Sequence, residues 1–174
     1  EDSRQLIQQL LTEEQWDLFL KTREINIAYS LEDRGRFRVN AYFQRGTAAS
    51  VIRQIRANIP TAAELNLPPF LERLVLSPRG LILVTGATGS GKSTTMAAMI
   101  NHRASQAEGH IITVEDPIEY LFQHDRSLVT QREVGIDTFS FGEALKSTLR
   151  QAPNVIYIGE LRDSETVDFA LHSA

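Results

Sequence analysis

A short glycine-rich stretch of this 174-residue chain has the residue types and the spacing of a phosphate-binding loop. Gly86 and Gly91 enclose four residues, and Lys92 and Ser93 follow directly. Glycines let consecutive backbone N–H groups converge on phosphate oxygens, and the positive end of a following helix favours the same negative charge. The lysine then binds the β and γ phosphates, and the serine hydroxyl is a hard oxygen ligand suited to Mg²⁺. The pattern predicts ATP or GTP binding by Gly86, Ala87, Thr88, Gly89, Ser90, Gly91, Lys92, Ser93 and Thr94.

Hydrolysis of a triphosphate also needs an acid near the metal and a group that orients the attacking water. Two apolar segments run into such acids: residues 111–114 lead to Glu115, Asp116 and Glu119, and residues 155–158 lead to Glu160. Ligands of open α/β sheets bind beyond the carboxyl ends of the strands, so both groups of acids are expected at the same phosphates. Spacing alone leaves the choice between them open.

The first part of the chain has the pattern of two short helices followed by an antiparallel sheet. Apolar residues at helical spacing within 6–11 predict the first helix, and a capping box from Thr12 to Gln15 predicts the start of the second. Alternating apolar residues in 25–29 and 37–43, with a third segment at 49–55, predict the strands. The turn between the first two strands is expected at 32–35, which includes Asp33.

A run of six arginines without any Asp or Glu crosses this predicted sheet. Alternation places Arg36 and Arg38 on the face opposite the apolar residues, which favours an anion facing that side. The six are Arg34, Arg36, Arg38, Arg45, Arg53 and Arg56.

The second part of the chain alternates apolar strands with helices. Prolines 60, 68, 69 and 78, a capping box from Thr61 to Glu64 and a short helix at 70–76 precede it. Strands are predicted at 81–85, 110–114 and 155–158. Helices are predicted up to about 105, from Ser140 to about 151, and from Ser164 onward. Alternating βα units predict a parallel sheet, so we assign residues 1–67 to a first domain, 68–79 to a linker and 80–174 to a second domain.

Composition narrows the class of protein further. The chain is 42% hydrophobic and 23% charged, with a formal net charge of −4, so it lacks the basic field of a general nucleic-acid binder. It has no cysteine, which removes disulfides and thiolate chemistry, and no apolar run of the length that a membrane span needs. Because it begins without methionine, we expect a piece of a longer protein.

Four stretches of the second part resemble a known family: GATGSGKSTT at 86–95, ITVEDPIEY at 112–120, LVTQREVG at 128–135 and IYIGELRDSET at 156–166. Together they resemble the secretion-type hexameric ATPases. Within these, the chain is most similar to the type IV pilus retraction (twitching motility) ATPases of the PilT/PilU type. Ala87 and the stretch LRQAPNVI at 149–156 favour the accessory, PilU-like branch. RFRVNAYFQRG at 36–46 is similar to a strand of the PAS-like N-terminal domain of the same family.

The resemblance implies an α/β fold with a RecA-like P-loop NTPase core and a parallel sheet, truncated after the Walker B strand. A partial α+β PAS-like domain would precede it. Carried over by motif, Glu119 would be the catalytic base and Glu160 the Walker B acid, with Ser93 and Glu160 near Mg²⁺. Arg38 and Arg53 would face the γ phosphate.

The function that the resemblance implies is that of an ATPase motor subunit, which hydrolyses Mg-ATP to power type IV pilus retraction. Such a subunit would form a homo-oligomer, a hexamer when complete, beside the principal retraction motor and a membrane platform protein. It would lie in the cytoplasm, peripheral at the inner membrane, and bind no nucleic acid. One alternative is a nucleotide-sensing scaffold with little turnover that assists another pilus motor. A third interpretation, after the motor and the scaffold, is a P-loop kinase, but the sequence shows no candidate for the acceptor pocket or lid that a kinase needs.

Overall fold

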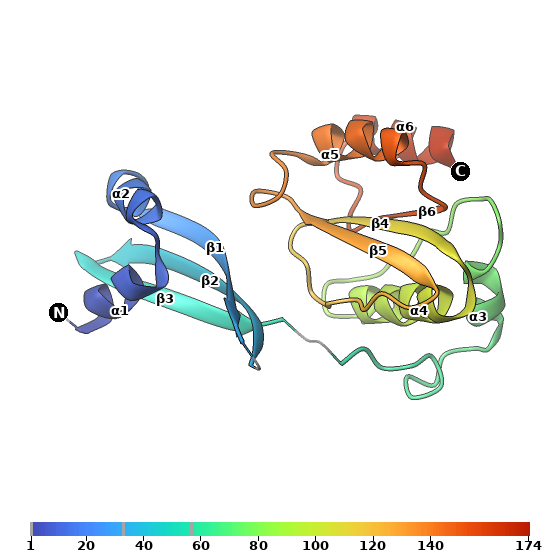
Figure 1. Cartoon of the computed structure of the whole chain (residues 1–174), viewed down its shortest axis with the longest axis horizontal. Coiled ribbons are helices and arrows are strands. Elements are labelled where there is room, and N and C mark those ends of the chain that lie inside the picture. The colour runs from blue at the N-terminus through green and yellow to red at the C-terminus, as the bar shows by residue number, and fades with distance from the viewer. Residues whose placement is uncertain (1, 33, 56–57) are drawn as a thin grey trace. The chain divides into compact units, whose positions relative to one another are not determined.

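The computed structural model describes residues 2–32, 34–55 and 58–174, which form two compact units, Glu1–Arg56 and Ala57–Ala174 (Figure 1). Asp33 and Arg56, both singled out in the sequence, lie outside the described residues. The division between the units comes earlier in the chain than the predicted boundary after residue 67, and the domain and linker assignment stays a prediction. Each unit has its own sheet and its own core.

The first unit is a three-stranded antiparallel sheet in the order β1-β2-β3 with two helices on one face. Its core joins Ile7 and Phe19 of the helices to apolar residues of the strands such as Val39 and Ala41. The elements are α1 (Asp2–Leu10), α2 (Glu13–Thr22), β1 (Glu24–Leu31), β2 (Gly35–Gln44) and β3 (Thr47–Gln54). This arrangement confirms the helices and the antiparallel strands that the apolar periodicity predicts.

The predicted capping box begins α2 as expected. The Thr12 hydroxyl accepts the Gln15 N–H at 3.3 Å, and the Gln15 side-chain oxygen accepts the Thr12 N–H at 3.0 Å. These two bonds satisfy backbone donors that the first turn of a helix leaves without partners. Arg23 caps the C-terminal end of the helix with a left-handed φ of 69°. Phe43 stacks on Phe19 of this helix, with the ring centroids 4.9 Å apart.

The second unit is a three-stranded parallel sheet in the order β5-β4-β6, which confirms the α/β class. Helix α4 covers one face, and α5 and α6 cover the other (Figure 1). Among the described residues, no helix combines the length and the apolar character that crossing a membrane requires. The elements are α3 (Phe70–Val75), α4 (Lys92–Gln106), β4 (Gly109–Glu115), β5 (Ser127–Glu133), α5 (Phe141–Thr148), the 3-10 turn η1 (Leu149–Gln151), β6 (Val155–Ile158) and α6 (Ser164–Ser173).

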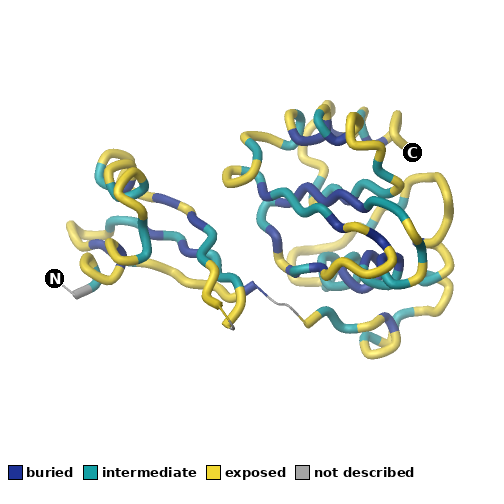
Figure 2. Tube along the Cα trace, viewed as in Figure 1, coloured by how far each residue is buried: buried dark blue, intermediate teal, exposed yellow. Residues whose placement is uncertain are grey.

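Alternation along the strands sorts side chains between the two faces of this sheet. Ile111 and Tyr157 pack toward α4, whereas Val114 and Ile156 pack toward α5 and α6. The central strand β4 is covered on both faces and is buried over its last five residues, the dark blue run in the second unit of Figure 2. Burial on both faces explains why β4 has a continuous apolar run rather than an alternating one.

Two local features differ from the predictions, and one predicted capping box forms. The predicted strand at 81–85 is irregular, and it forms no hydrogen-bonded ladder with any strand of the described chain. Strand β5 is absent from the predictions, although its residues carry one of the family motifs. The capping box at Thr61 and Glu64 forms, with the Thr61 N–H donating to the Glu64 carboxylate at 2.7 Å. It starts only a turn at 62–66, since Pro68 disfavours helix at the residue before it.

Candidate functional site

The glycine-rich loop leads directly into α4, as a phosphate-binding loop requires. Gly91 caps the helix with a left-handed φ of 94°, a conformation that costs glycine little. A Cβ on Gly86 would lie 2.7 Å from the Ser90 hydroxyl oxygen, so a larger residue there would displace the Ser90 side chain. The backbone geometry therefore depends on the two glycines that define the motif.

The first turn of α4 offers the features of an anion site. Gly91 provides no side-chain cap, and no acidic residue stands in the first turn. The N–H groups of that turn have no carbonyl partners within the helix and carry the positive end of its dipole. Lys92 reaches back over the loop, and its Nζ donates to the carbonyl oxygens of Gly86 and Ala87, each at 2.9 Å.

The acids predicted from two strand ends lie at one edge of the sheet. Val114 pairs with Ile158 in the parallel register, and the Gly159 N–H donates to the Val114 carbonyl at 2.8 Å. Arg162 links the two ends, because its Nε lies 2.6 Å from Glu160 Oε1 and its Nη1 lies 3.9 Å from Asp116 Oδ2. Within the described chain, that Glu160 oxygen accepts no hydrogen bond of good geometry, so its contact with Arg162 is an ion pair.

Glu115 at the end of β4 has a different character from the other acids. Its side chain is 5% exposed, and burial raises the pKa of its carboxyl group from 4.5 to about 7. Hydrogen bonds from Thr113 Oγ1 at 2.6 Å and Gln131 Nε2 at 3.2 Å oppose this shift and stabilise the charged form. Glu119, four residues later, is exposed. Of the acids that follow β4, Glu119 is therefore the more accessible to a ligand.

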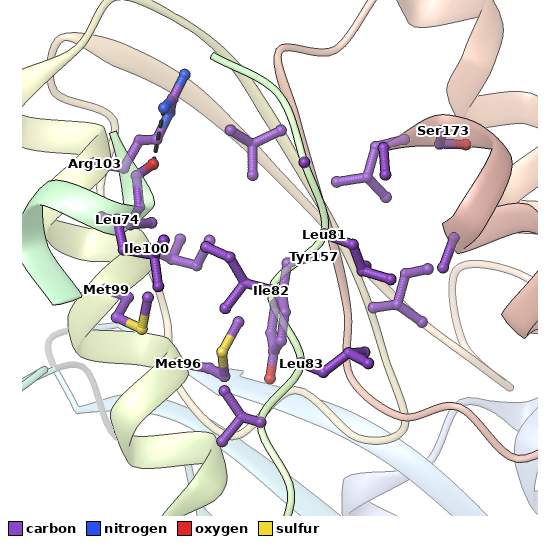
Figure 3. Close-up of a pocket in the computed structure, with 18 of the residues that line it drawn as sticks. Leu74, Leu81, Ile82, Leu83, Met96, Met99, Ile100, Arg103, Tyr157 and Ser173 are labelled. Atoms are coloured by element: carbon purple, nitrogen blue, oxygen red, sulfur yellow. Dashed lines mark hydrogen bonds between the residues drawn. The ribbon is translucent and has the colours of Figure 1, made fainter. Parts of the chain in front are cut away.

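The hollow beside the loop connects the lysine to Glu160. It has a volume of about 960 Å³ and is lined by 81–86 and α4 on one side and by β6 and α6 on the other (Figure 3). In Figure 3, Ile82 points toward Met96 and Ile100 of α4, while Leu81 and Leu83 point the other way. Lys92, Ser93 and Glu160 all contribute to its walls. The structure thus brings the loop and the β6 acid to one cavity.

The two arginines that the resemblance selects lie directly opposite one another in the first unit. Arg38 of β2 pairs with Arg53 of β3 in the antiparallel register, so both side chains are on the face away from the core. Like charges in opposite positions destabilise a sheet, and among the described side chains neither arginine has a carboxylate partner. A ligand with several negative charges would relieve this repulsion.

Sequence reasoning missed three residues that the structure ties to the site. Arg162 contacts Glu160 and Asp116. Tyr120 shares a hydrogen bond with Thr94, one residue after Ser93, and Gln131 binds the turn after β4. All three lie inside stretches that carry the family resemblance, which was the only signal available for them.

Comparison with known proteins gives consistent matches. The family model described as "Type II/IV secretion system protein" matches residues 52–174. The chain is 52% identical to the type IV pilus ATPase PilU of Pseudomonas aeruginosa, over 98% of this chain and 45% of that one. It is 43% identical to the type IV pilus retractation ATPase PilT of the same organism, over 97% and 49% of the two chains.

A solved structure of the pilus retraction motor PilT with bound ADP superimposes with a TM-score of 0.95 and 45% identity. The match covers 99% of this chain and 50% of that one. The chain spans about half the length of the relatives that it matches.

Proposed function

Because this chain belongs to the type II/IV secretion system protein family, we propose that it carries the ATP site of a motor for type IV pilus retraction. One observation supports this most strongly: the loop and helix around Lys92 have the geometry of a triphosphate site. Gly86 and Gly91 shape the loop, the first turn of α4 lacks a side-chain cap, and a lysine lies over the loop. The relatives PilU and PilT are pilus ATPases, and one structure of PilT holds ADP.

The residues divide the chemistry between binding and hydrolysis. Phosphate oxygens offer Lys92 charged acceptors in place of the two neutral carbonyls that it now contacts, which makes stronger hydrogen bonds. Glu119 is the proposed base: its exposed carboxylate accepts a proton from the attacking water. Arg38 and Arg53 stabilise the charge that develops on the γ phosphate, because guanidinium groups bind phosphate oxygens with two hydrogen bonds.

The residues present also fit magnesium. The Ser93 hydroxyl and the Glu160 carboxylate are hard oxygen donors on opposite walls of one hollow. In residues 2–32, 34–55 and 58–174, no group of three or more His, Cys, Asp or Glu could hold a metal alone, so the fit is to an ion shared with phosphates. When bound, Mg²⁺ supplies positive charge to the phosphate oxygens.

The wider assembly is proposed from the family. The complete protein would act as a homo-oligomer, a hexamer, together with the principal retraction motor and a membrane platform protein of the pilus machine. It would work in the cytoplasm at the inner membrane and bind no nucleic acid, in keeping with its net charge of −4.

Phosphate release by the protein at its natural length tests the proposal. With ATP and magnesium, the unchanged protein should release phosphate, whereas Lys92→Ala should lose nucleotide binding and turnover together. Lys146→Ala is the matched control, because it removes an exposed lysine that pairs with Glu165 on the helices of the other face.

The same assay in the presence and absence of the principal motor separates the motor from the scaffold. Turnover by this protein alone supports the motor. If ATP binds but phosphate appears only when the principal motor is added, the protein is a nucleotide-sensing scaffold. Turnover in Lys92→Ala equal to that of the unchanged protein would contradict both.

A further inference from the structure

One buried and one half-buried side chain of β5 hold the turn that carries Glu119. Gln131 binds this turn twice: its Nε2 donates to the Tyr120 carbonyl at 2.9 Å, and its Oε1 accepts the Phe122 N–H at 2.9 Å. Glu133, two residues along the strand, accepts the Ile118 N–H at 3.3 Å. Residues i and i+2 of a strand point to the same face. Neighbouring side chains of one strand therefore hold every second residue of the turn, on both sides of Glu119.

The same glutamine connects the turn to the end of β4. Gln131 Nε2 also donates to Glu115 Oε1 at 3.2 Å, and that carboxylate oxygen accepts the Thr113 hydroxyl at 2.6 Å. The turn that carries the proposed base is thus connected through Gln131 to the end of β4.

One hydrogen bond joins this turn to the phosphate-loop helix. The Tyr120 hydroxyl lies 3.0 Å from Thr94 Oγ1, and Tyr120 is only 5% exposed. Thr94 follows Ser93 in the first turn of α4, next to the phosphate loop. Its side chain contacts Tyr120, the residue after Glu119. This contact uses only the hydroxyl of Thr94. Its backbone N–H is the group that would serve the predicted role in nucleotide binding.

We propose that Thr94, Tyr120 and Gln131 form a positioning clamp, which sets the turn carrying Glu119 at a fixed distance from the phosphate loop. The inference rests on the proposed function, because ATP hydrolysis would give the clamp its purpose. When nucleotide moves the phosphate loop, the Thr94–Tyr120 hydrogen bond transmits the movement to the turn. Gln131 holds the same turn on β5. Displacement of a reacting group by about 1 Å costs on the order of a hundredfold in rate, so loss of the bond affects turnover more than binding.

Removal of single hydroxyl groups tests the clamp in the natural-length protein. Tyr120→Phe and Thr94→Val should each lower kcat for ATP hydrolysis by roughly tenfold, with less than about a twofold change in ATP affinity. The double variant should be no slower than either single one, because both remove the same bond. Thr94→Ser keeps a hydroxyl and should restore most of the turnover. Tyr29→Phe and Thr47→Val, the same changes in the first unit, serve as controls.

A second measurement does not depend on turnover. Hydrogen exchange of the amides of Ile118 and Phe122 should slow when ADP binds to the unchanged protein and should not respond to ADP in Tyr120→Phe. No response in the unchanged protein overturns the clamp whether or not it hydrolyses ATP. Equal kcat in Tyr120→Phe, Thr94→Val and the unchanged protein overturns it as well, while the proposed function survives because phosphate is still released. If the unchanged protein releases no phosphate but its exchange responds as expected, the motor proposal fails and the clamp remains.

Discussion

Glu115 and Glu119 at one edge of the sheet differ in exposure, and this difference supports the roles proposed for them. Glu115 is buried under Thr113 and Gln131, whereas Glu119 is exposed on the turn that follows. Glu160 follows the neighbouring strand β6 and forms an ion pair with Arg162, whose Nε lies 2.6 Å from Glu160 Oε1. A base must reach the water that it activates, so exposure favours Glu119, and Glu115 supports it from behind.

Replacement of the proposed base gives the first prediction. Glu119→Gln keeps the size of the side chain but removes its basicity, so hydrolysis should slow by a factor of about 10² to 10⁴ while ATP still binds. Rapid filtration with labelled ATP would show the nucleotide retained on the variant. Glu143→Gln, a change of the same type on α5, is the control. Full turnover in Glu119→Gln would transfer the role to Glu160 or Glu115.

Glu115 gives a prediction about pH. Its folded pKa is raised from 4.5 to about 7, so between these values the folded chain holds a proton that the unfolded chain has lost. The free energy of unfolding therefore falls as the pH rises through this range. Glu115→Gln removes this contribution and should be more stable than the unchanged protein at pH 8, by up to about 3 kcal/mol, but not at pH 4.

Urea unfolding followed by circular dichroism at the two pH values measures this difference. Glu108→Gln replaces an exposed glutamate just before the same strand and should leave the pH dependence unchanged. The assignment of Glu115 is wrong if Glu115→Gln and the unchanged protein show the same change in stability between pH 4 and pH 8.

The residues of the site were predictable to different degrees. The loop from Gly86 to Ser93 and the acids after two strands could be found from spacing, because glycine, lysine and strand-end acids are local signals. Tyr120, Gln131 and Arg162 could not, because each has partners that spacing does not connect with it: Thr94 is 26 residues from Tyr120, and Arg162 links Glu160 to the distant Asp116. A glutamine in a polar strand and a tyrosine after a turn have no distinctive pattern of their own.

At the scale of elements, the same contrast holds between local and non-local signals. The start of α2 follows from a capping box within four residues, and β6 follows from a short apolar run. Strand β5 was missed because its residues SLVTQRE are mostly polar, with Gln131 and Glu133 turned inward as hydrogen-bonding groups. The segment 81–85 reads as a strand, yet a strand also needs a neighbour, and Leu83 stays 61% exposed.

The capping box of α2 gives a prediction for the first unit. Thr12→Ala removes the acceptor for the Gln15 N–H and should cost about 1 kcal/mol of stability. Thr12→Ser keeps the hydroxyl and should match the unchanged protein. Trp16 is the only tryptophan of the chain and lies in α2, 5.6 Å from Phe19 between ring centroids, so its fluorescence reports the unfolding of this unit. Equal midpoints for Thr12→Ala and Thr12→Ser would show that the cap contributes nothing.

Across the complete chain, the proposal assigns roles to residues of both units. The loop, Glu119 and Glu160 belong to the second unit, and Arg38 and Arg53 belong to the first. The opposed arginines are a cost to the first unit on its own, since like charges directly across a sheet destabilise it. A triphosphate bound by both arginines would offset this destabilisation.

The arginine pair gives a prediction with two parts. Arg38→Ala and Arg53→Ala should each lower turnover more than tenfold with little change in ATP affinity, because their interaction develops in the transition state. Each should also stabilise the first unit by about 0.2 to 1 kcal/mol, measured by Trp16 fluorescence during urea unfolding. Arg34→Ala, an exposed arginine at the turn before β2, is the control. Unchanged turnover in both variants would exclude the pair from the site.

The central claim is that the loop around Lys92 binds the phosphates of ATP, and calorimetry tests it most directly. Titration of Mg-ATP into the natural-length protein should give a saturable heat of binding, and the same titration into Lys92→Ala should give none. If the unchanged protein shows no heat, or if Lys92→Ala binds ATP equally well, the loop does not hold the nucleotide and the proposed motor has no ATP site.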